Sequence, residues 1–297
     1  MSDRLWGYVY LALAMVLVGS TVVASKIMGN GLPVFSATAL RFAIAFPCFL
    51  LLMRVFGVRL PKMSRRDWLL LVLQAGAGSV GYTTLLIAGL HLTSAADAGV
   101  MIGTLPIVSA VIAIVLLGER PQVSQLLAVL LAGAGVLSIA VQPAGGDGHS
   151  LLGNGLVFAA IICEGLFILL NKRLQADLTP LALSTVMTGF GLVLSLVPAL
   201  FETPWNIPFD SLAIWAAVYY AMVPTVAGFL LWYAGIARVS GSEAALFTAM
   251  APVSALVLAV CLLGEVLNGR QISGMACVLL AIAGMGFLAK YKDKMRG

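Results

Sequence analysis

Glu164 is the residue whose position most strongly indicates chemistry. It is the fourteenth residue of the apolar run 151–171. If that run is a helix, the carboxylate lies about 20 Å along it at 1.5 Å per residue, too deep to be a helix cap. Carboxylates at such depth in a membrane are rare and generally face a cavity or a partner. Binding an ammonium group and carrying a proton both fit; a hydrogen bond to a neighbouring helix is the structural alternative.

Arg41 is a second charge placed inside an apolar run. It lies eight residues after the start of Pro33–Phe56, or about 12 Å along a helix. A buried arginine is costly unless it is paired or hydrated. It could contact a carboxylate of a ligand, or it could bond to carbonyl groups at a helix end.

Four large side chains are candidates for lining an apolar ligand cavity: Tyr82, Trp232, Met101 and Phe247. Aromatic and thioether side chains pack well against apolar parts of a ligand. The alternative is contact with lipid, because the sequence does not fix how each helix is rotated. Met101 and Phe247 are 146 residues apart, which becomes important below.

The sequence predicts neither a metal site, nor a cofactor, nor a catalytic constellation. The segment Gly76–Gly81 spells GxGxxG, but it lies inside an apolar run and not between a strand and a helix, so close helix packing explains it better than nucleotide binding. The two histidines, His91 and His149, have no zinc-site spacing. We therefore do not expect an enzyme.

Composition shows what must position these residues. Of the 297 residues, 61% are hydrophobic and 10% charged, against about 25% charged in soluble domains. The sequence therefore predicts an all-α integral membrane protein without a nucleic-acid-binding domain. Ten apolar runs can be drawn, most of them long enough to span a bilayer: Trp6–Met28, Pro33–Phe56, Trp68–Leu90, Ser94–Leu117, Ser124–Val141, Leu151–Asn171, Pro180–Leu200, Ser211–Ala237, Ser242–Leu263 and Asn268–Ala289.

The basic residues indicate the orientation of these ten runs. With the N-terminus inside, 14 of the 17 Lys and Arg residues fall in inner segments, while Lys26 and Arg270 fall in outer ones and Arg41 lies within a helix. Cytoplasmic loops carry such an excess of positive charge. Both termini are therefore expected in the cytoplasm, and the protein in a bacterial inner membrane.

The chain also contains an internal repeat at a constant offset of 146 residues. Matching segments include Leu116–Glu119 with Leu262–Glu265, and Gly19 with Gly165. We expect two five-helix units, residues 1–146 and 147–297. Because five is odd, the second unit must enter the membrane in the opposite direction, which gives an inverted repeat of the kind that secondary transporters use.

The repeat also pairs residues at the helix ends. Lys26 and Glu265 end helices at the outer face, and the offset maps them onto Lys172 and Glu119 at the inner face. Each pair could close its own side of a central cavity. Placement that favours the helix dipole, with snorkelling of the lysines, is the alternative.

Two prolines and two acids repeat in the same way. Pro106 and Pro252 lie within the fourth and ninth runs, where proline kinks a helix; they could act as hinges or as static bends. Asp97 and Glu243 each follow a serine by three residues, which is typical of a capping box.

The sequence resembles the EamA family of the drug/metabolite transporter superfamily. The resemblance rests on the ten runs in two halves, on Gly19 and Lys26 in the first run, on Arg41, and on the motif from Asp97 to Gly118-Glu119 with its copy ending at Gly264-Glu265. It implies a secondary transporter of small metabolites, an exporter of amino acids or related compounds, working by alternating access. Expected partners are a small-molecule substrate, membrane lipid and protons as the coupling ion. Import or facilitation of another metabolite, and a membrane-embedded enzyme, are the alternatives.

Overall fold

The computed structural model describes residues 3–117, 127, 130–131, 133–135, 150–171, 173–206, 208–238, 247 and 250–296. The predicted inner pair, Lys172 and Glu119, lies outside these ranges, as do His149 and Glu243. Over the described part of the chain every regular element is a helix, which confirms the all-helical prediction.

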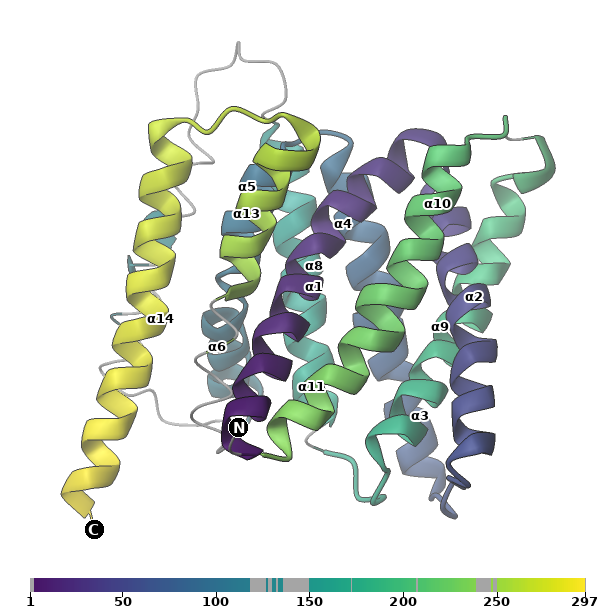
Figure 1. Cartoon of the computed structure of the whole chain (residues 1–297), viewed down its shortest axis with the longest axis horizontal. Coiled ribbons are helices and arrows are strands. Elements are labelled where there is room, and N and C mark those ends of the chain that lie inside the picture. Colours follow the sequence, from purple (N-terminus) through teal and green to yellow (C-terminus); the bar gives the residue numbers. More distant parts are fainter. Residues whose placement is uncertain are drawn as a thin grey trace.

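The first half of the chain contributes seven described elements, which run up and down the bundle in Figure 1. The third predicted span is one continuous rod in three parts, with a π-helical segment, η1, in its middle. The elements are α1 (Asp3–Gly31), α2 (Val34–Val55), α3 (Arg65–Gln74), η1 (Ala75–Gly81), α4 (Tyr82–Leu90), α5 (Ala95–Ile102) and α6 (Leu105–Leu117).

The second half follows the same plan. The eighth predicted span of the chain again has a π-helical segment, η3, between two α-helices. A short 3-10 turn, η2, precedes that span. The elements are α8 (Leu151–Asn171), α9 (Pro180–Phe201), η2 (Pro204–Asn206), α10 (Ser211–Tyr220), η3 (Ala221–Ala227), α11 (Gly228–Ile236), α13 (Met250–Leu263) and α14 (Gly269–Arg296).

The element bounds recur at the offset found in the sequence. Adding 146 to both ends of α2, α3, η1 and α4 gives the ends of α9, α10, η3 and α11. π-Helical segments are rare and occur frequently at functional sites. The two π-helical segments differ in sequence. η1 is rich in glycine (AGAGSVG), while η3 contains Pro224, which lacks an N–H to donate.

Short polar side chains define where the helices begin. Ser94 accepts a hydrogen bond from Asp97 N at 3.0 Å, so the predicted cap at the start of α5 is confirmed. Asp210 accepts two backbone hydrogen bonds at the start of α10. Such caps satisfy backbone N–H groups that have no partner within the helix.

The fourth predicted span is interrupted. Gly103 and Thr104 form a turn between α5 and α6, so Pro106 is the second residue of α6 and does not lie inside a continuous helix. Its repeat equivalent Pro252 lies within the described part of α13. Pro106 thus lies in the first turn of a helix, where the missing N–H costs little. Their hinge role stays a prediction.

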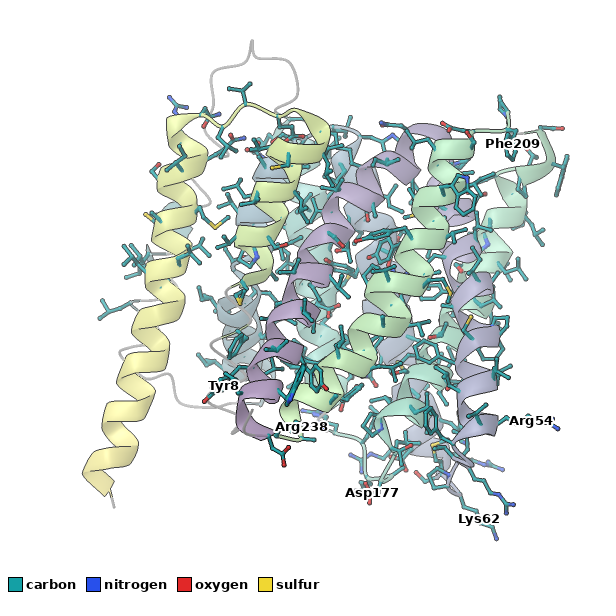
Figure 2. All side chains as sticks on the ribbon, viewed as in Figure 1. Tyr8, Arg54, Lys62, Asp177, Phe209 and Arg238 are labelled. Atoms are coloured by element: carbon teal, nitrogen blue, oxygen red, sulfur yellow. The ribbon has the colours of Figure 1, made fainter. Side chains whose placement is uncertain are left out.

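Six described helical stretches are long and apolar enough to cross a membrane. Large apolar side chains cover the outside of the bundle, among them Leu51, Phe201 and Leu262. Charged side chains gather at the ends of the bundle, with Arg54, Lys62, Asp177 and Arg238 at the lower end of Figure 2. An apolar belt between polar ends is the surface that a bilayer requires.

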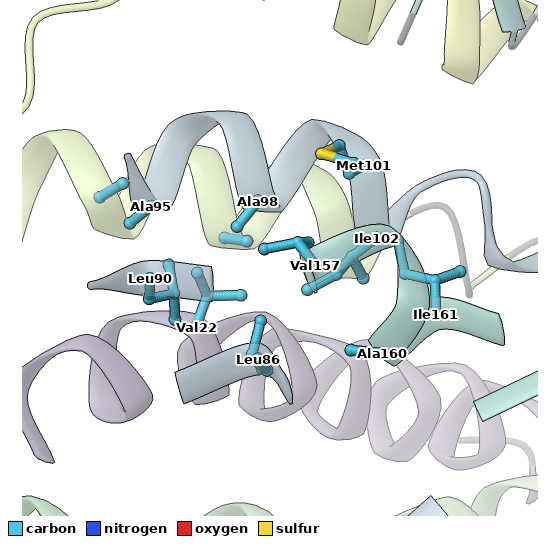
Figure 3. Packing of buried hydrophobic residues seen from close by; sticks show 12 residues of the cluster. Val22, Leu86, Leu90, Ala95, Ala98, Met101, Ile102, Val157, Ala160 and Ile161 are labelled. Atoms are coloured by element: carbon cyan, nitrogen blue, oxygen red, sulfur yellow. The ribbon is translucent and has the colours of Figure 1, made fainter. Parts of the chain in front are cut away.

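The helices pack closely through buried apolar side chains and glycines. The largest cluster joins α1, α4, α5, α8 and α13, and Figure 3 shows Val22, Leu86 and Val157 meeting within it. Gly19 of α1 lies against the backbone of α13, since a Cβ there would come within 2.5 Å of Ala251 O. Small residues at such crossings let membrane helices approach each other.

Candidate functional site

A cavity of about 150 Å³ lies where both halves of the chain meet. Six elements contribute to it: α1, α4, α5, α6, α8 and α10. Four of its lining residues are apolar and four carry a carboxyl or hydroxyl group. They are Val18, Thr21, Tyr82, Ile102, Leu105, Ile161, Glu164 and Tyr220.

Glu164 supplies the carboxylate of this cavity. Its repeat equivalent Val18 lines the same cavity from α1, so the two halves contribute related positions with different chemistry. Tyr82 of α4 and Thr21 of α1 add hydroxyl groups to the lining of the cavity. A carboxylate with hydroxyl groups and aromatic rings around it can bind an ammonium group through charge, hydrogen bonds and cation–π contact.

Arg41 does not line the cavity but lies behind one of its walls. Its Nε donates to Thr225 Oγ1 at 3.1 Å and its Nη1 donates to Thr83 Oγ1 at 2.7 Å. The guanidinium also stacks on the Tyr220 ring, 3.9 Å from the ring centroid. Arg41 remains close enough to act electrostatically on Glu164. These contacts tie α2 to α4 and η3 and hold Tyr220 at the cavity.

The other three residues predicted to bind substrate lie elsewhere. Met101 is 2% exposed and packs in the cluster of Figure 3. Trp232 packs against Ala14 and Met15 of α1 in a second cluster, and Phe247 stacks on Tyr8 at 5.6 Å in the same region. Of the six predicted residues, the structure therefore brings only Glu164 and Tyr82 together at the cavity.

Sequence reasoning missed Thr21, Tyr220 and the apolar wall. Ile161 could have been found, because it lies three residues before Glu164 and so on the same helical face. Val18 could have been found from the repeat offset. Nothing in the sequence pointed to Tyr220, which is one of several aromatic residues in its helix.

The structure brings together Lys26, near the end of α1, and Glu265, just after α13. These helix ends lie at the upper end of Figure 1. Lys26 Nζ lies 3.5 Å from Glu265 Oε1 and donates to Thr93 O at 2.9 Å. The same carboxylate accepts hydrogen bonds from Ala95 N and Ala96 N, at 2.9 and 2.8 Å. Glu265 thus caps α5 and binds α1 at once.

A buried polar network continues from this pair. Asp97 Oδ1 accepts a hydrogen bond from Gln271 Nε2 at 2.7 Å, and Thr93 Oγ1 donates to Asn154 Oδ1 at 2.6 Å. The network therefore joins α1, α5, α8 and α14.

Within the described ranges, no group of three or more His, Cys, Asp or Glu side chains could hold a metal ion. The four cysteines are free thiols.

A bundle of membrane-length helices around a cavity that contains a carboxylate fits a membrane transport protein. The chain belongs to the EamA-like transporter family, which matches it twice, over residues 5–141 and 151–287. The starts of these two matches differ by 146 residues, the offset of the internal repeat.

Three relatives and one solved structure are similar to the chain over most of its length. It is 35% identical over 281 residues to the uncharacterized transporter YetK of Bacillus subtilis, covering 93% of this chain and 85% of YetK. It is 25% identical to the uncharacterized transporter YyaM of the same organism, over 97% and 96% of the two chains. It is 29% identical to a probable terminal-alkyne amino-acid exporter of Streptantibioticus cattleyicolor, over 96% and 93%. A crystal structure at 23% identity shares the fold, with a TM-score of 0.65 over 98% of both chains.

Proposed function

We propose that the protein is a secondary transporter that exports a small metabolite bearing an ammonium group, an amino acid or a related compound, by alternating access. The observation that carries this proposal is the Glu164 carboxylate, which faces a cavity formed by both halves of the chain. Hydroxyl groups and aromatic rings surround it, so the cavity is suited to a small organic cation or zwitterion.

The proposal includes ten membrane helices in two halves, residues 1–146 and 147–297, related as an inverted repeat. Lys26 near the end of α1 and Asn154 near the start of α8 both bond to Thr93, which supports opposite directions for these equivalent helices. The packing also supports a two-fold relation. A Cβ at Gly89 would meet Val157, and a Cβ at Gly235 would meet Leu11. The repeat relates the two contacts, because Gly235 is the equivalent of Gly89 and Leu11 is the equivalent of Val157.

The proposed orientation places both termini in the cytoplasm of a bacterial cell. Both ends of the described chain, in α1 and α14, lie at the lower end of Figure 1, where Figure 2 also shows Arg54, Lys62 and Arg238. An excess of Lys and Arg marks the cytoplasmic side. The upper end is then the outer face, and the Lys26–Glu265 pair closes it.

Export is supported by the name of one relative, a probable terminal-alkyne amino-acid exporter. The alternative is import or facilitated movement of another metabolite. Cells that overproduce the protein, preloaded with labelled amino acids and amines, test the direction. Faster efflux than in vector-only cells supports export, whereas faster uptake with unchanged efflux would reverse the assignment.

Proton coupling is a second part of the proposal. Glu164 could release its proton when the cargo's ammonium group binds and regain it after the cargo leaves, so that a proton gradient drives export. A membrane-embedded enzyme is the alternative of another class, but the family and its named relatives are transporters.

Removing the charge of Glu265 should loosen the outer closure. We expect Glu265→Gln to raise thiol labelling of a Thr21→Cys cavity reporter from the outside, in a chain whose four native cysteines are replaced. The rise should be at most about fivefold, because a partly exposed ion pair is worth about 0–1 kcal/mol. Glu202→Gln is the matched control, since Glu202 accepts the same kind of bonds from Phe35 N and Ser36 N at the start of α2. Equal labelling in the Glu265→Gln and Glu202→Gln variants would show that the Lys26–Glu265 pair has no role in closing the outer side.

Arg41→Lys should separate a structural role from a substrate-binding role. A lysine cannot reach Thr83 and Thr225 together as the planar guanidinium does, so we expect a lower unfolding temperature and a modest loss of flux. Thermal unfolding of the purified variant measures the first effect. An unchanged unfolding temperature with abolished flux would instead indicate direct contact between Arg41 and the cargo.

A further inference from the structure

Gln74 is a buried polar side chain whose amide has no partner. It is the last residue of α3, is 0% exposed, and neither its Nε2 nor its Oε1 makes a hydrogen bond. Burying an amide without a hydrogen bond is costly, and in a membrane protein the alternative apolar side chain would be cheaper. Such a group calls for an explanation beyond the packing of this conformation.

Buried neighbours of Gln74 on the same rod belong to an apolar cluster. Leu71 and Ala75, its neighbours on the same rod, lie in a cluster with Val186 and Met187 of α9. A leucine would suit this environment at least as well as the amide. The amide is therefore not explained as part of a polar network.

The repeat relates Gln74 to a residue of the cavity. Adding 146 to 74 gives Tyr220, which lines the cavity beside Glu164. Gln74 directly precedes the π-helical segment η1, and Tyr220 directly precedes η3. The two side chains thus occupy the same position in equivalent rods. Both are buried, with Tyr220 2% and Gln74 0% exposed, but Tyr220 lines the cavity and Gln74 lies outside it.

Contacts around the two positions correspond as well. Near Tyr220, Arg41 donates a hydrogen bond to Thr225. The offset maps Arg41 onto Met187 and Thr225 onto Ser79. These two residues are also bonded, because Ser79 Oγ donates to Met187 O at 3.5 Å. In an inverted repeat, each half takes up the conformation of the other when the transporter switches sides. The enclosed position of the first half then becomes the cavity position.

We propose that Gln74 binds the cargo in the opposite conformation, after the outer side has opened. Its amide, with one acceptor and two donor hydrogens, then meets the ammonium or carboxyl group of the cargo, while Tyr220 no longer lines the cavity. This inference rests on the proposed transport function and adds a binding residue from the first half of the chain.

Thiol accessibility tests the exchange. Three single-cysteine variants are made in a chain without native cysteines: Gln74→Cys, Tyr220→Cys and the control Leu71→Cys. Each is compared in two backgrounds, one with the Lys26–Glu265 pair intact and one with the pair removed by Lys26→Met and Glu265→Gln. We expect N-ethylmaleimide to label Tyr220→Cys faster with the pair intact and Gln74→Cys faster once the pair is removed. Each change should be at most about fivefold, because the pair is worth about 0–1 kcal/mol. Leu71→Cys should stay slow in both backgrounds.

The outcomes separate this inference from the proposed function. If labelling of Tyr220→Cys changes with the pair while that of Gln74→Cys does not, alternation stands and the role of Gln74 is wrong. If neither changes, the Lys26–Glu265 pair does not control the switch between the two sides, and the inference is overturned. Faster labelling of Leu71→Cys together with Gln74→Cys would show general loosening and would also overturn the inference.

Gln74→Leu gives a second test that does not depend on labelling. The variant should unfold at the same or a higher temperature than the wild type, because it removes an unpartnered buried amide, and its flux should fall by about tenfold. A lower unfolding temperature with normal flux would show a structural role only.

Discussion

Replacing Glu164 with glutamine is expected to abolish flux, or to uncouple it from the proton gradient, in a protein that still folds. The substitution keeps the size and hydrogen-bonding capacity of the side chain but removes its charge and its exchangeable proton. An ammonium group then loses its charge partner in the cavity, and loss of such a partner costs about 1.5–3 kcal/mol or roughly tenfold to a hundredfold in affinity. Flux at several pH values in vesicles that contain the purified variant measures both effects.

Asp177→Asn is the matched control for this experiment. Asp177 is an exposed acid at the lower end of the bundle, so its loss changes the net charge equally without touching the cavity. Its flux should equal that of the wild type. Wild-type flux with an unchanged pH dependence in Glu164→Gln would exclude Glu164 from the mechanism.

Gly19→Ala should have the largest effect on stability. A Cβ at this position would lie 2.5 Å from Ala251 O and 2.7 Å from Ala255 N, and these backbone atoms of α13 cannot turn aside. The crossing of α1 and α13 must therefore widen, at a cost of about 1–3 kcal/mol or more. We expect a clear fall in the unfolding temperature and in the yield of folded protein, measured by fluorescence-detected size exclusion after heating.

Gly155→Ala is the control for that substitution. Gly155 lies on an exposed face of α8, and a Cβ there would meet nothing within 4 Å. It should unfold no earlier than the wild type, since alanine is the better helix former. Equal stability of the two variants would mean that the α1–α13 crossing is not as close as the structure has it.

The helices were predictable because their signals are local. Long apolar runs and the 146-residue offset located α2 and α9 to within a few residues, and Ser94 marked the start of α5 as expected. The π-helical segments were not predictable. Their sequences, glycine-rich in η1 and proline-containing in η3, are equally consistent with ordinary small-residue packing.

The composition of the cavity was predictable only for Glu164 and Tyr82. A charge deep in an apolar run must face a cavity or a partner, so the position of Glu164 could be predicted from the sequence. An apolar or aromatic side chain carries no such constraint, because core, cavity and lipid suit it almost equally. Met101 therefore packs in the core and Trp232 against α1, since the rotation of their helices is set by neighbours that are distant in sequence.

Directional flux through the purified protein is the most direct test of the transport function. Proteoliposomes are given a gradient of each labelled amino acid or amine in turn, and both the location and the chemical identity of the label are followed. At least one compound should cross saturably and unchanged, and its movement should be lost with Glu164→Gln. Chemical conversion of a compound without its movement, or movement no faster than in protein-free liposomes for every compound, would contradict the assignment as a transporter of ammonium-bearing metabolites.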